Sequence, residues 1–345
     1  DSNDVTFGSA ESMHKAFKEI VAEYRPKCVM LVTTCVIEVI GDDYDAIAEE
    51  LTKQYRIPVM AVHTEHFKCE DHFPGFERAI TACQSIMQPQ KCDGSVNVLG
   101  QRFGDFADTE LYALLQKSGV KIGVQLPSGC TSDDIRHAPA AKINIVVNDI
   151  ALPLAHKMQE QYGVPYVYFN RFAAPEKILL AYQHLFAYLA LPLPAEVSAK
   201  FDECKALEQE TMPVVQGVPY IFGNTQYDCF ELNSYLCRLG LVPQLIQSNK
   251  LRQEHFKDIK GILATTDPYI CKAANIAPLQ YVYDVLHPWI YIGHEFGERL
   301  RRKGIAQLHS DPAGKMLGFE CKTFLLKILQ QAVADAKVFR KEAGL

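Results

Sequence analysis

The chain has 345 residues, a formal net charge of −6 and 48% hydrophobic residues, which is enough length for two or three domains with large cores. The negative charge argues against a general nucleic-acid-binding protein, which needs a basic face. No apolar run reaches the roughly 18 residues of a membrane span. The first residues, DSNDVTFG, are not typical of a signal peptide, and eleven irregularly spaced cysteines without a Cys-x-x-Cys pair are typical of reduced thiols. We therefore expect a cytoplasmic protein.

The first predicted strand ends at a cysteine. Apolar residues at helical spacing predict a helix over 9–24. The apolar, β-branched run Cys28–Thr34 then predicts a strand that is buried on both faces, with Cys35 at its end. Gly41 provides a turn, and Asp42 and Asp43 are good caps for the helix that is expected over Asp43–Tyr55. Cys35 is thus predicted to lie at the carboxyl end of a parallel strand, where α/β proteins place their chemistry.

Four interpretations of Cys35 remain open from the residues alone. It is a small buried residue, since free cysteine often packs as a hydrophobe. It is a nucleophile, although no base is adjacent in the sequence. It is a redox thiol, although Cys28, the nearest partner, lies within the strand. Or it is an iron–sulfur ligand, which needs further cysteines from other segments or chains.

A second strand is expected over Ile57–Val62, followed by a loop rich in histidine. In this loop His63, His66, Cys69 and His72 recur every third residue. Imidazole and thiolate are ligands of zinc and iron, so a metal site is one interpretation of the loop. Closed structural sites usually use tighter paired spacings, and solvated loop histidines are the alternative.

The rest of the chain alternates between strands and helices with short links, which predicts parallel sheets with right-handed crossovers. Helices are expected over Gly75–Met87, Thr109–Lys117, Ser132–Arg136, Leu152–Tyr162, Pro175–Leu191, Ala195–Gln209 and Phe319–Phe339. Strands are expected over Ser95–Leu99, Lys121–Leu126, Ile143–Val147, Val164–Phe169 and Val218–Gly223. A third unit of the same kind continues through Cys229–Leu239, Val242–Gln247, His255–Ile259, Tyr281–Leu286 and Gly293–Lys303.

Neither a Gly-x-Gly-x-x-Gly nor a Walker A motif occurs, which argues that this chain does not itself bind a nucleotide.

Four segments, in the right order, resemble the nitrogenase component 1 family. This family comprises nitrogenase molybdenum–iron protein subunits, their cofactor-assembly scaffold relatives and nitrogenase-like reductases. The segments are DVTFGSAESMHKAFKEI (Asp4–Ile20), the pattern Thr-Thr-Cys-x-x-x-x-Ile-Gly-Asp-Asp (Thr33–Asp43), KINIVVNDIALPLAHKMQEQYGVPYV (142–167) and QLHSDPAGKMLGFE (307–320).

The resemblance implies three Rossmann-like α/β domains with parallel sheets, the first of them incomplete. The predicted boundaries are 1–92, 93–212 and 213–318, with the helix 319–340 packing back on the first domain to complete it. Family members carry an earlier region with further cluster-ligating cysteines. Either this is a short relative, or an N-terminal part is absent from the sequence.

The resemblance also implies site residues. Cys35 aligns with a ligand of an iron–sulfur cluster at a subunit interface. Glu65 and His72 fall in the loop that borders the family's cofactor pocket, with Glu65 as a cofactor-binding candidate and His72 as a catalytic candidate. His309 stands where the family has its cofactor-ligating histidine, as a metal-binding and catalytic candidate, although a histidine bonded to loop carbonyls is the alternative. We expect Cys35, His72 and His309 to share one cleft between domains, with side chains within about 20 Å of one another.

The resemblance is incomplete at one place. In nitrogenase itself the strand of the middle domain is followed by a cysteine that holds the catalytic metal cluster. Here that place reads Val147–Asn148–Asp149, with no thiol. Asn148 is a candidate cofactor-binding residue. A pocket with His309 but no cysteine would suit an altered cluster, an assembly intermediate or an organic ligand of the tetrapyrrole type; the alternative is a subunit that carries only the interface cluster.

Two functions follow from the resemblance, and the sheets alone allow a third. The leading one is the electron-accepting, substrate-reducing component of an ATP-dependent two-component reductase. The alternative is a scaffold that holds a metal cluster during its assembly. The third, a sugar- or metal-binding protein of similar sheets, is disfavoured because no signal peptide is evident. The expected partners are a homologous subunit or second copy and an ATP-hydrolysing iron protein, with neither nucleic acid nor membrane.

Overall fold

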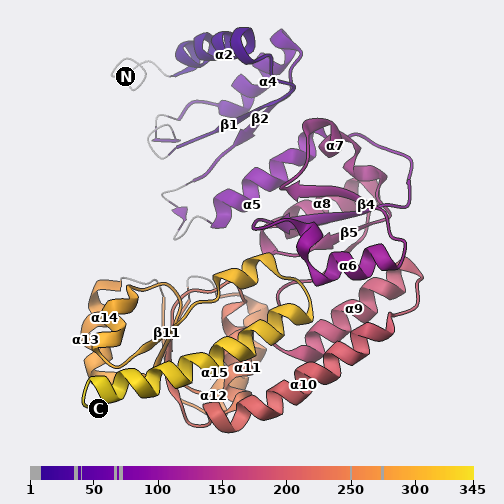
Figure 1. Ribbon diagram of the computed structural model, residues 1–345. Coiled ribbons are helices and arrows are strands. Elements are labelled where there is room, and N and C mark those ends of the chain that lie inside the picture. The colour runs from indigo at the N-terminus through magenta and orange to yellow at the C-terminus, as the bar shows by residue number, and fades with distance from the viewer. Residues whose placement is uncertain are drawn as a thin grey trace. The chain divides into compact units, whose positions relative to one another are not determined.

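The computed structural model describes residues 9–34, 38–39, 41–65, 68–69, 73–248, 251–272 and 276–345 (Figure 1). The chain divides into two compact units. The first comprises Asp1–Gln101 and Lys121–Val167, and the second comprises Arg102–Val120 and Tyr168–Leu345. Both units combine helices with parallel strands, which confirms the predicted α/β class.

The first unit begins with a two-stranded parallel sheet, in which β1 (Val29–Val32) pairs with β2 (Val59–Val62). The helices of this region are α2 (Ala10–Tyr24), α4 (Tyr44–Tyr55) and α5 (Phe73–Ala82). The helix α4 begins as predicted, because the Asp43 carboxylate accepts a hydrogen bond from the backbone N–H of Ala46 (2.9 Å). The core that α2 and α4 form with the sheet is built on Phe17, Tyr44, Ile47 and Leu51.

The prediction that the first strand is buried on both faces is wrong. Along β1, Met30 and Val32 are 37% and 51% exposed, whereas Val29 and Leu31 pack against the core. Successive side chains of a strand point to opposite faces, so one face of β1 is covered and the other is open among the described residues. The residue types of this run suit a buried strand, but they do not determine how many faces are covered.

A second sheet in the first unit has the strand order β4-β3-β5-β6, and its strands are β3 (Val96–Gln101), β4 (Ile122–Pro127), β5 (Ile143–Val146) and β6 (Tyr166–Tyr168). The strand β3 pairs in parallel with both β4 and β5. Every residue of β3 is buried, which places the centre of this sheet in the core. The helices are α7 (Ser132–His137) and α8 (Leu152–Tyr162), with the 3-10 turns η2 (Cys83–Ile86), η4 (Ala138–Ala140) and η5 (Asp149–Ala151).

The second unit contains a five-stranded, all-parallel sheet with the order β11-β10-β7-β8-β9. Its strands are β7 (Pro219–Phe222), β8 (Val242–Gln247), β9 (Tyr269–Cys271), β10 (Ile290–Ile292) and β11 (Ala306–Leu308). The first two are predicted from the sequence, and the last three are not. Each missed strand is three residues long, too short for a recognisable period.

Long helices accompany this sheet. The helices described in the second unit are α6 (Glu110–Lys117), α9 (Pro175–Leu189), α10 (Ala195–Val215), α11 (Cys229–Leu239), α12 (Phe256–Leu263), α13 (Ile276–Leu286), α14 (Gly297–Arg302) and α15 (Phe319–Glu342). The 3-10 turns are η3 (Phe106–Asp108), η6 (Gln253–His255) and η7 (Asp311–Lys315). The helix α15 packs along α10 and against β11, and buries Leu325, Leu326 and Leu329 in the main core (Figure 1).

The domain boundaries, and the packing of the last helix on the first domain, stay predictions. The described residues form three sheets, but the chain divides into two units. None of the described helices combines the length and the hydropathy that a membrane span requires.

Candidate functional site

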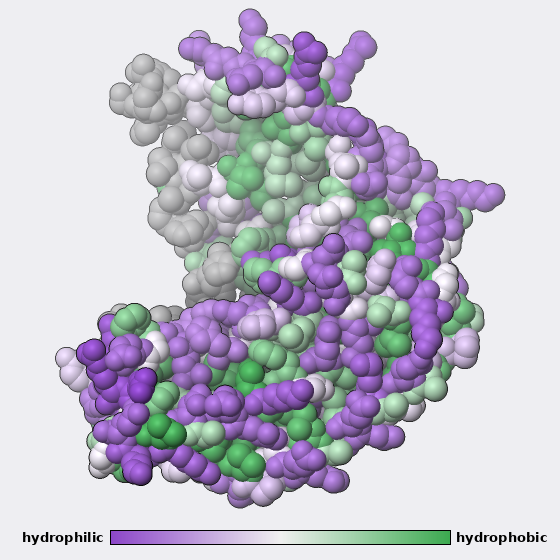
Figure 2. All heavy atoms as spheres, viewed as in Figure 1, coloured by the Kyte–Doolittle hydropathy of each residue, from purple (hydrophilic) through white to green (hydrophobic). Residues whose placement is uncertain are grey.

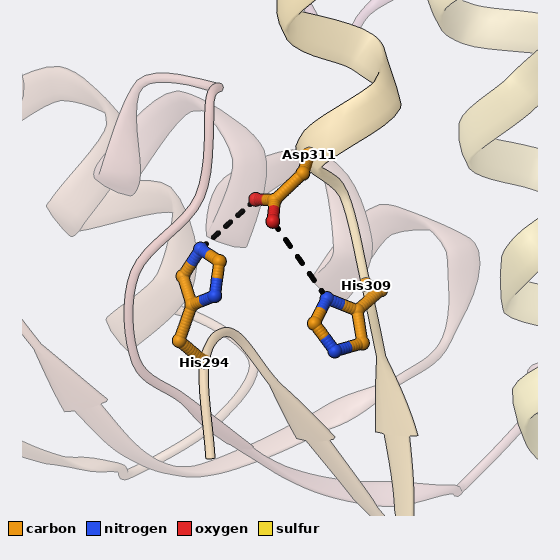
Figure 3. Close-up of side chains that lie close together, drawn as sticks. All are labelled: His294, His309 and Asp311. Carbon is orange, nitrogen blue, oxygen red and sulfur yellow. Dashed lines mark ion pairs between the residues drawn. The ribbon is translucent and has the colours of Figure 1, made fainter. Parts of the chain in front are cut away.

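Two histidines and an aspartate come together where β10 and β11 end (Figure 3). These strands are parallel neighbours, so their carboxyl ends lie at the same edge of the sheet. Gly293 and His294 follow β10, and His309, Ser310 and Asp311 follow β11. The potential donor atoms of His294, His309 and Asp311 all lie within 4.8 Å of one another.

The aspartate carboxylate faces both imidazole rings. Oδ1 of Asp311 is 2.9 Å from Nε2 of His294, and Oδ2 is 3.8 Å from Nδ1 of His309. The ring centroids are 5.6 Å apart and the ring planes meet at 81°. The side chains of His294, His309 and Asp311 are 54%, 56% and 45% exposed, so solvent reaches all three.

The loop that carries His294 is held through its backbone. Gly293 has φ +138°, and a Cβ added there would lie 2.7 Å from the backbone nitrogen of Asn224, so this turn requires glycine. Nε2 of Gln307 donates hydrogen bonds to the carbonyl oxygens of Gly293 and Glu295, both at 2.9 Å. These contacts fix the loop of His294 against β11, which carries Gln307.

A buried arginine holds the turn that carries Asp311. Arg171 is 4% exposed. Its Nε donates to the carbonyl oxygen of Ala313 (3.0 Å), and its Nη2 donates to that of Gly314 (2.6 Å). Both acceptors belong to η7, which begins at Asp311. The exposed aspartate therefore starts a turn whose backbone is anchored in the core.

A second set of polar contacts joins the segments that follow β1 and β2. Oε1 of Glu38 accepts hydrogen bonds from the Thr33 hydroxyl (2.5 Å) and from the backbone N–H of Glu65 (2.7 Å). The Thr33 hydroxyl also accepts a hydrogen bond from the backbone N–H of Thr64 (3.0 Å). Cys35 belongs to this junction in the sequence, but it lies outside the described residues.

Glu65 is engaged within its own loop. Its carboxylate pairs with Arg78 (2.5 Å) and with Lys68 (2.7 Å). The hydrogen bond from Lys68, together with the charge of Arg78, lowers the pKa of Glu65. Its backbone has φ +47°, an uncommon conformation for a residue other than glycine. These contacts give Glu65 a part in shaping the loop after β2.

A cavity of about 920 Å³ lies beside β2 in the same unit. It is lined by residues of β2, α4, α5 and α8, among them Thr52, Met60, Arg78, Thr81 and Lys157. Figure 2 shows hydrophobic side chains gathered at the surface in the region of β2. The walls combine apolar strand residues with charged groups from the helices, and no set of three clustered metal donors occurs there among the described residues.

Asn148 caps the turn that follows β5. Its Oδ1 accepts a hydrogen bond from the backbone N–H of Ile150 (3.1 Å), and Val147 before it is fully buried. A Cβ added to Gly100 would lie 2.9 Å from the Cβ of Asn148, so the two backbones approach closely. The position at which the resemblance places a cluster-binding cysteine is thus occupied by a packed valine and a capping asparagine.

Several other cysteines are held as neutral thiols. Burial raises the pKa of Cys83 to about 11, and those of Cys229 and Cys321 to about 12. Because the thiolate is the reactive and metal-binding form, these positions favour packing over chemistry. In the part of the chain that the structure describes, only the group at the ends of β10 and β11 brings three potential ligands within 4.8 Å.

The comparisons with known proteins agree with this architecture. The family model of the nitrogenase component 1 type oxidoreductases matches residues 1–311. The chain belongs to this family. The solved structure described as nitrogenase Cp1 at pH 6.5 superposes with a TM-score of 0.78 over 98% of this chain and 82% of that one, at 15% identity, which supports the fold alone.

Relatives in the nitrogenase component 1 family include cofactor-biosynthesis proteins. The nitrogenase iron-molybdenum cofactor biosynthesis protein NifE of Clostridium pasteurianum is 33% identical over 48% of this chain and 37% of its own length. The NifE protein of Rippkaea orientalis is 29% identical, over 48% of this chain and 36% of its own length. The nitrogenase molybdenum-iron protein alpha chain of Methanosarcina barkeri is 28% identical, over 48% of this chain and 32% of its own length. The chain thus spans about a third of the length of the curated relatives it matches.

The predicted site residues lie in different parts of the molecule. His309 comes together with His294 and Asp311. Glu65 and Asn148 belong to the first unit and His309 to the second. Cys35 and His72 lie outside the described residues. The shared cleft, the role of the histidine-rich loop in metal binding and the role of each predicted residue therefore stay predictions.

Sequence reasoning missed His294 and Asp311. One signal is available: Ile290–Ile292 is a short apolar run and Ala306–Leu308 has apolar residues at both ends, and each is followed within two residues by a histidine. Two such runs in a parallel α/β chain can end at the same sheet edge. Asp311 is part of a segment that resembles the family, but its nearness to His294 depends on the pairing of β10 with β11.

Proposed function

We propose that this chain is a subunit of a scaffold on which a metal cluster is held during assembly, rather than of an enzyme that uses the cluster for reduction. The observation that carries the proposal is the end of β5, where Val147 is fully buried and the side chain of Asn148 caps a turn. A permanently bound catalytic cluster would need a strong anchor there, and no thiolate is present. The relatives that are cofactor-biosynthesis proteins also support the scaffold proposal.

In this proposal the cluster is the cargo that the scaffold releases after assembly. A cluster that must be released should be held by few protein ligands. His309 is the proposed ligand, and its exposed ring is accessible to an incoming cluster. A single imidazole holds an iron cluster less firmly than a set of thiolates does. Cys35 is proposed as one ligand of a second, interface iron–sulfur cluster, whose other ligands come from elsewhere.

A reductase is the second candidate. The family is described as oxidoreductases, and the alpha chain of a molybdenum-iron protein is among the relatives. In that case the partner is an ATP-hydrolysing iron protein that delivers electrons. In either case the chain works with a homologous subunit or a second copy, in the cytoplasm.

Two assays on the anaerobically purified native complex distinguish the candidates. A scaffold transfers its cluster to a cluster-free nitrogenase component 1 acceptor, and shows no ATP-dependent reduction of small substrates. A reductase turns over such substrates and retains its cluster. Turnover without transfer would overturn the scaffold proposal.

The iron content of variants tests the two proposed ligands. Cys35→Ala should lose the interface cluster, and His309→Ala should lower the loading of the cargo cluster while the interface cluster remains. Cys92→Ala is the matched control, since Cys92 is an exposed thiol in the link before β3. Full iron content in Cys35→Ala would make Cys35 a packing residue.

A further inference from the structure

The three residues at the ends of β10 and β11 have the composition of a site for a single metal ion. Two imidazoles and one carboxylate are the protein ligands of many mononuclear sites that leave coordination positions open. They suit first-row transition metals such as Fe²⁺, Co²⁺, Ni²⁺ and Zn²⁺, whereas Mg²⁺ and Ca²⁺ prefer sites built from oxygen alone.

The distances fit such an ion. Ligand atoms about 2.0–2.2 Å from a common ion lie roughly 3–3.5 Å from one another. In the structure, Oδ1 of Asp311 lies 2.9 Å from Nε2 of His294, and Oδ2 of Asp311 lies 3.8 Å from Nδ1 of His309. All three potential donor atoms lie within 4.8 Å of one another, close to the spacing that one shared ion requires.

The backbone is already fixed. Gly293 and Gln307 hold the loop of His294, and Arg171 holds the turn of Asp311. His309 follows β11 directly, and Ser310 beside it is buried. A backbone fixed in this way reduces the conformational entropy that the site loses when an ion binds, compared with three residues on mobile loops.

We propose that His294, His309 and Asp311 bind one divalent first-row transition-metal ion when no cluster occupies His309. The three side chains provide three ligands, and water or an incoming group fills the remaining positions, which the exposure of the residues leaves accessible. This inference goes beyond the scaffold proposal, because it requires neither a cluster nor a partner subunit. It gives His294 and Asp311, which have no place in that proposal, a direct role.

Titration with Co²⁺ tests the site on the full chain, purified without metal and without iron–sulfur cluster. We expect one Co²⁺ per chain at saturation and visible absorption bands of a cobalt ion with nitrogen and oxygen ligands. Zn²⁺ should displace the Co²⁺, and an excess of Mg²⁺ on the order of a hundredfold should not. Binding of Mg²⁺ in competition with Co²⁺ would contradict a site of two imidazoles.

Variants separate this site from unspecific binding. His294→Ala and Asp311→Asn should each weaken Co²⁺ binding by roughly tenfold or more and change the absorption bands. The control is His14→Ala, since His14 forms a surface pair with Glu50 (3.6 Å) in the first unit and should leave the titration unchanged. Unaltered binding in His294→Ala, or an equal loss in His14→Ala, would overturn the inference. Neither result would affect cluster transfer by the wild-type complex, so the scaffold proposal is judged separately.

Discussion

Nε of Arg171 lies 3.0 Å from the carbonyl oxygen of Ala313, and this buried hydrogen bond connects the core of the second unit to the turn that begins at the exposed Asp311. The same guanidinium also donates to the carbonyl oxygen of Gly314, so the turn is held at two successive residues. Burying a charged group is favourable only if it is hydrogen-bonded, so the arginine and the turn depend on each other.

Replacing Arg171 should therefore affect both stability and the site. Hydrogen bonds from charged donors contribute about 1.5–3 kcal/mol each, so Arg171→Met should lower the free energy of unfolding by about 3 kcal/mol. Because the turn of Asp311 loosens, Co²⁺ binding should weaken as well. Chemical denaturation and the cobalt titration measure the two effects.

The control for this change is Arg302→Met. Arg302 is 78% exposed and pairs with Glu298 on the surface of α14, so its loss should change stability by less than about 0.5 kcal/mol. If the two arginine variants unfold at the same denaturant concentration, Arg171 does not anchor the turn.

The loop of His294 provides a second prediction. Gly293→Ala places a methyl group 2.7 Å from the backbone nitrogen of Asn224 and strains a backbone with φ +138°. We expect a loss of more than about 2 kcal/mol in stability together with weaker metal binding. Denaturant unfolding and the cobalt titration measure these effects.

Gly217→Ala is the control that separates the effect of a close contact with the added methyl group from the effect of the positive φ. Gly217 also has positive φ (+74°), but apart from its chain neighbours no atom lies within 4 Å of the added methyl group. Only the conformational cost of about 1–2 kcal/mol remains, and Co²⁺ binding should be unchanged. Equal effects of the two substitutions on binding would show that the contact with Asn224 does not position the loop.

Elements with a strong local signal are predictable from the sequence. Asp43 marks the start of α4, and the helix over 152–162 is predicted with both of its ends. Features that depend on tertiary packing are not predictable in this way. Met30 and Val32 have the residue types of a buried strand, yet they are exposed because only one face of β1 is covered among the described residues.

The candidate site shows the same division. His309 is found through the resemblance of its segment to a family, which does not require knowledge of the sheet. His294 precedes it by 15 positions and follows a strand of only three residues, so the sequence signal for it is weak and does not show that the two histidines are neighbours. They become neighbours because β10 and β11 pair in parallel, and that pairing is a property of the folded sheet.

The start of α15 gives a third prediction. The Glu110 carboxylate accepts hydrogen bonds from the backbone N–H groups of Phe319 (2.9 Å) and Glu320 (3.2 Å) and from the Tyr182 hydroxyl (2.8 Å). It thereby caps a helix that begins 209 positions later in the sequence. Glu110→Ala should cost about 3 kcal/mol, because buried donors lose their acceptor.

Glu110→Gln is the informative companion variant. It keeps one acceptor oxygen but removes the charge at the helix N-terminus, so about half of the loss should remain. Thermal or denaturant unfolding measures both variants. An unchanged midpoint in Glu110→Ala would mean that water replaces the carboxylate at no cost.

The last prediction concerns a buried lysine in α15. Lys322 is fully buried; its Nζ lies 3.4 Å from Oε1 of Glu208 and 3.3 Å from the centre of the Tyr235 ring. Burial lowers the pKa of Lys322 from 10.5 to about 7, although the charges of Glu208 and of Cys204 oppose this change. The folded chain therefore releases this proton near pH 7, whereas the unfolded chain retains it up to about pH 10.

Stability should consequently rise with pH in this window. Below about pH 7 the lysine is protonated in both states and contributes no slope. Between about pH 7 and 10 the unfolded state binds one more proton, so the free energy of unfolding increases by at most about 1.4 kcal/mol per pH unit from this group.

In Lys322→Met this contribution is absent, while the buried thiols and the other groups titrate as before. The difference in unfolding free energy between wild type and variant, measured by denaturation at about pH 7.5 and 9.5, should shift in favour of the wild type by about 2 kcal/mol. Parallel pH profiles of the two proteins would mean that Lys322 stays protonated in the fold, stabilised by Glu208 and the ring of Tyr235.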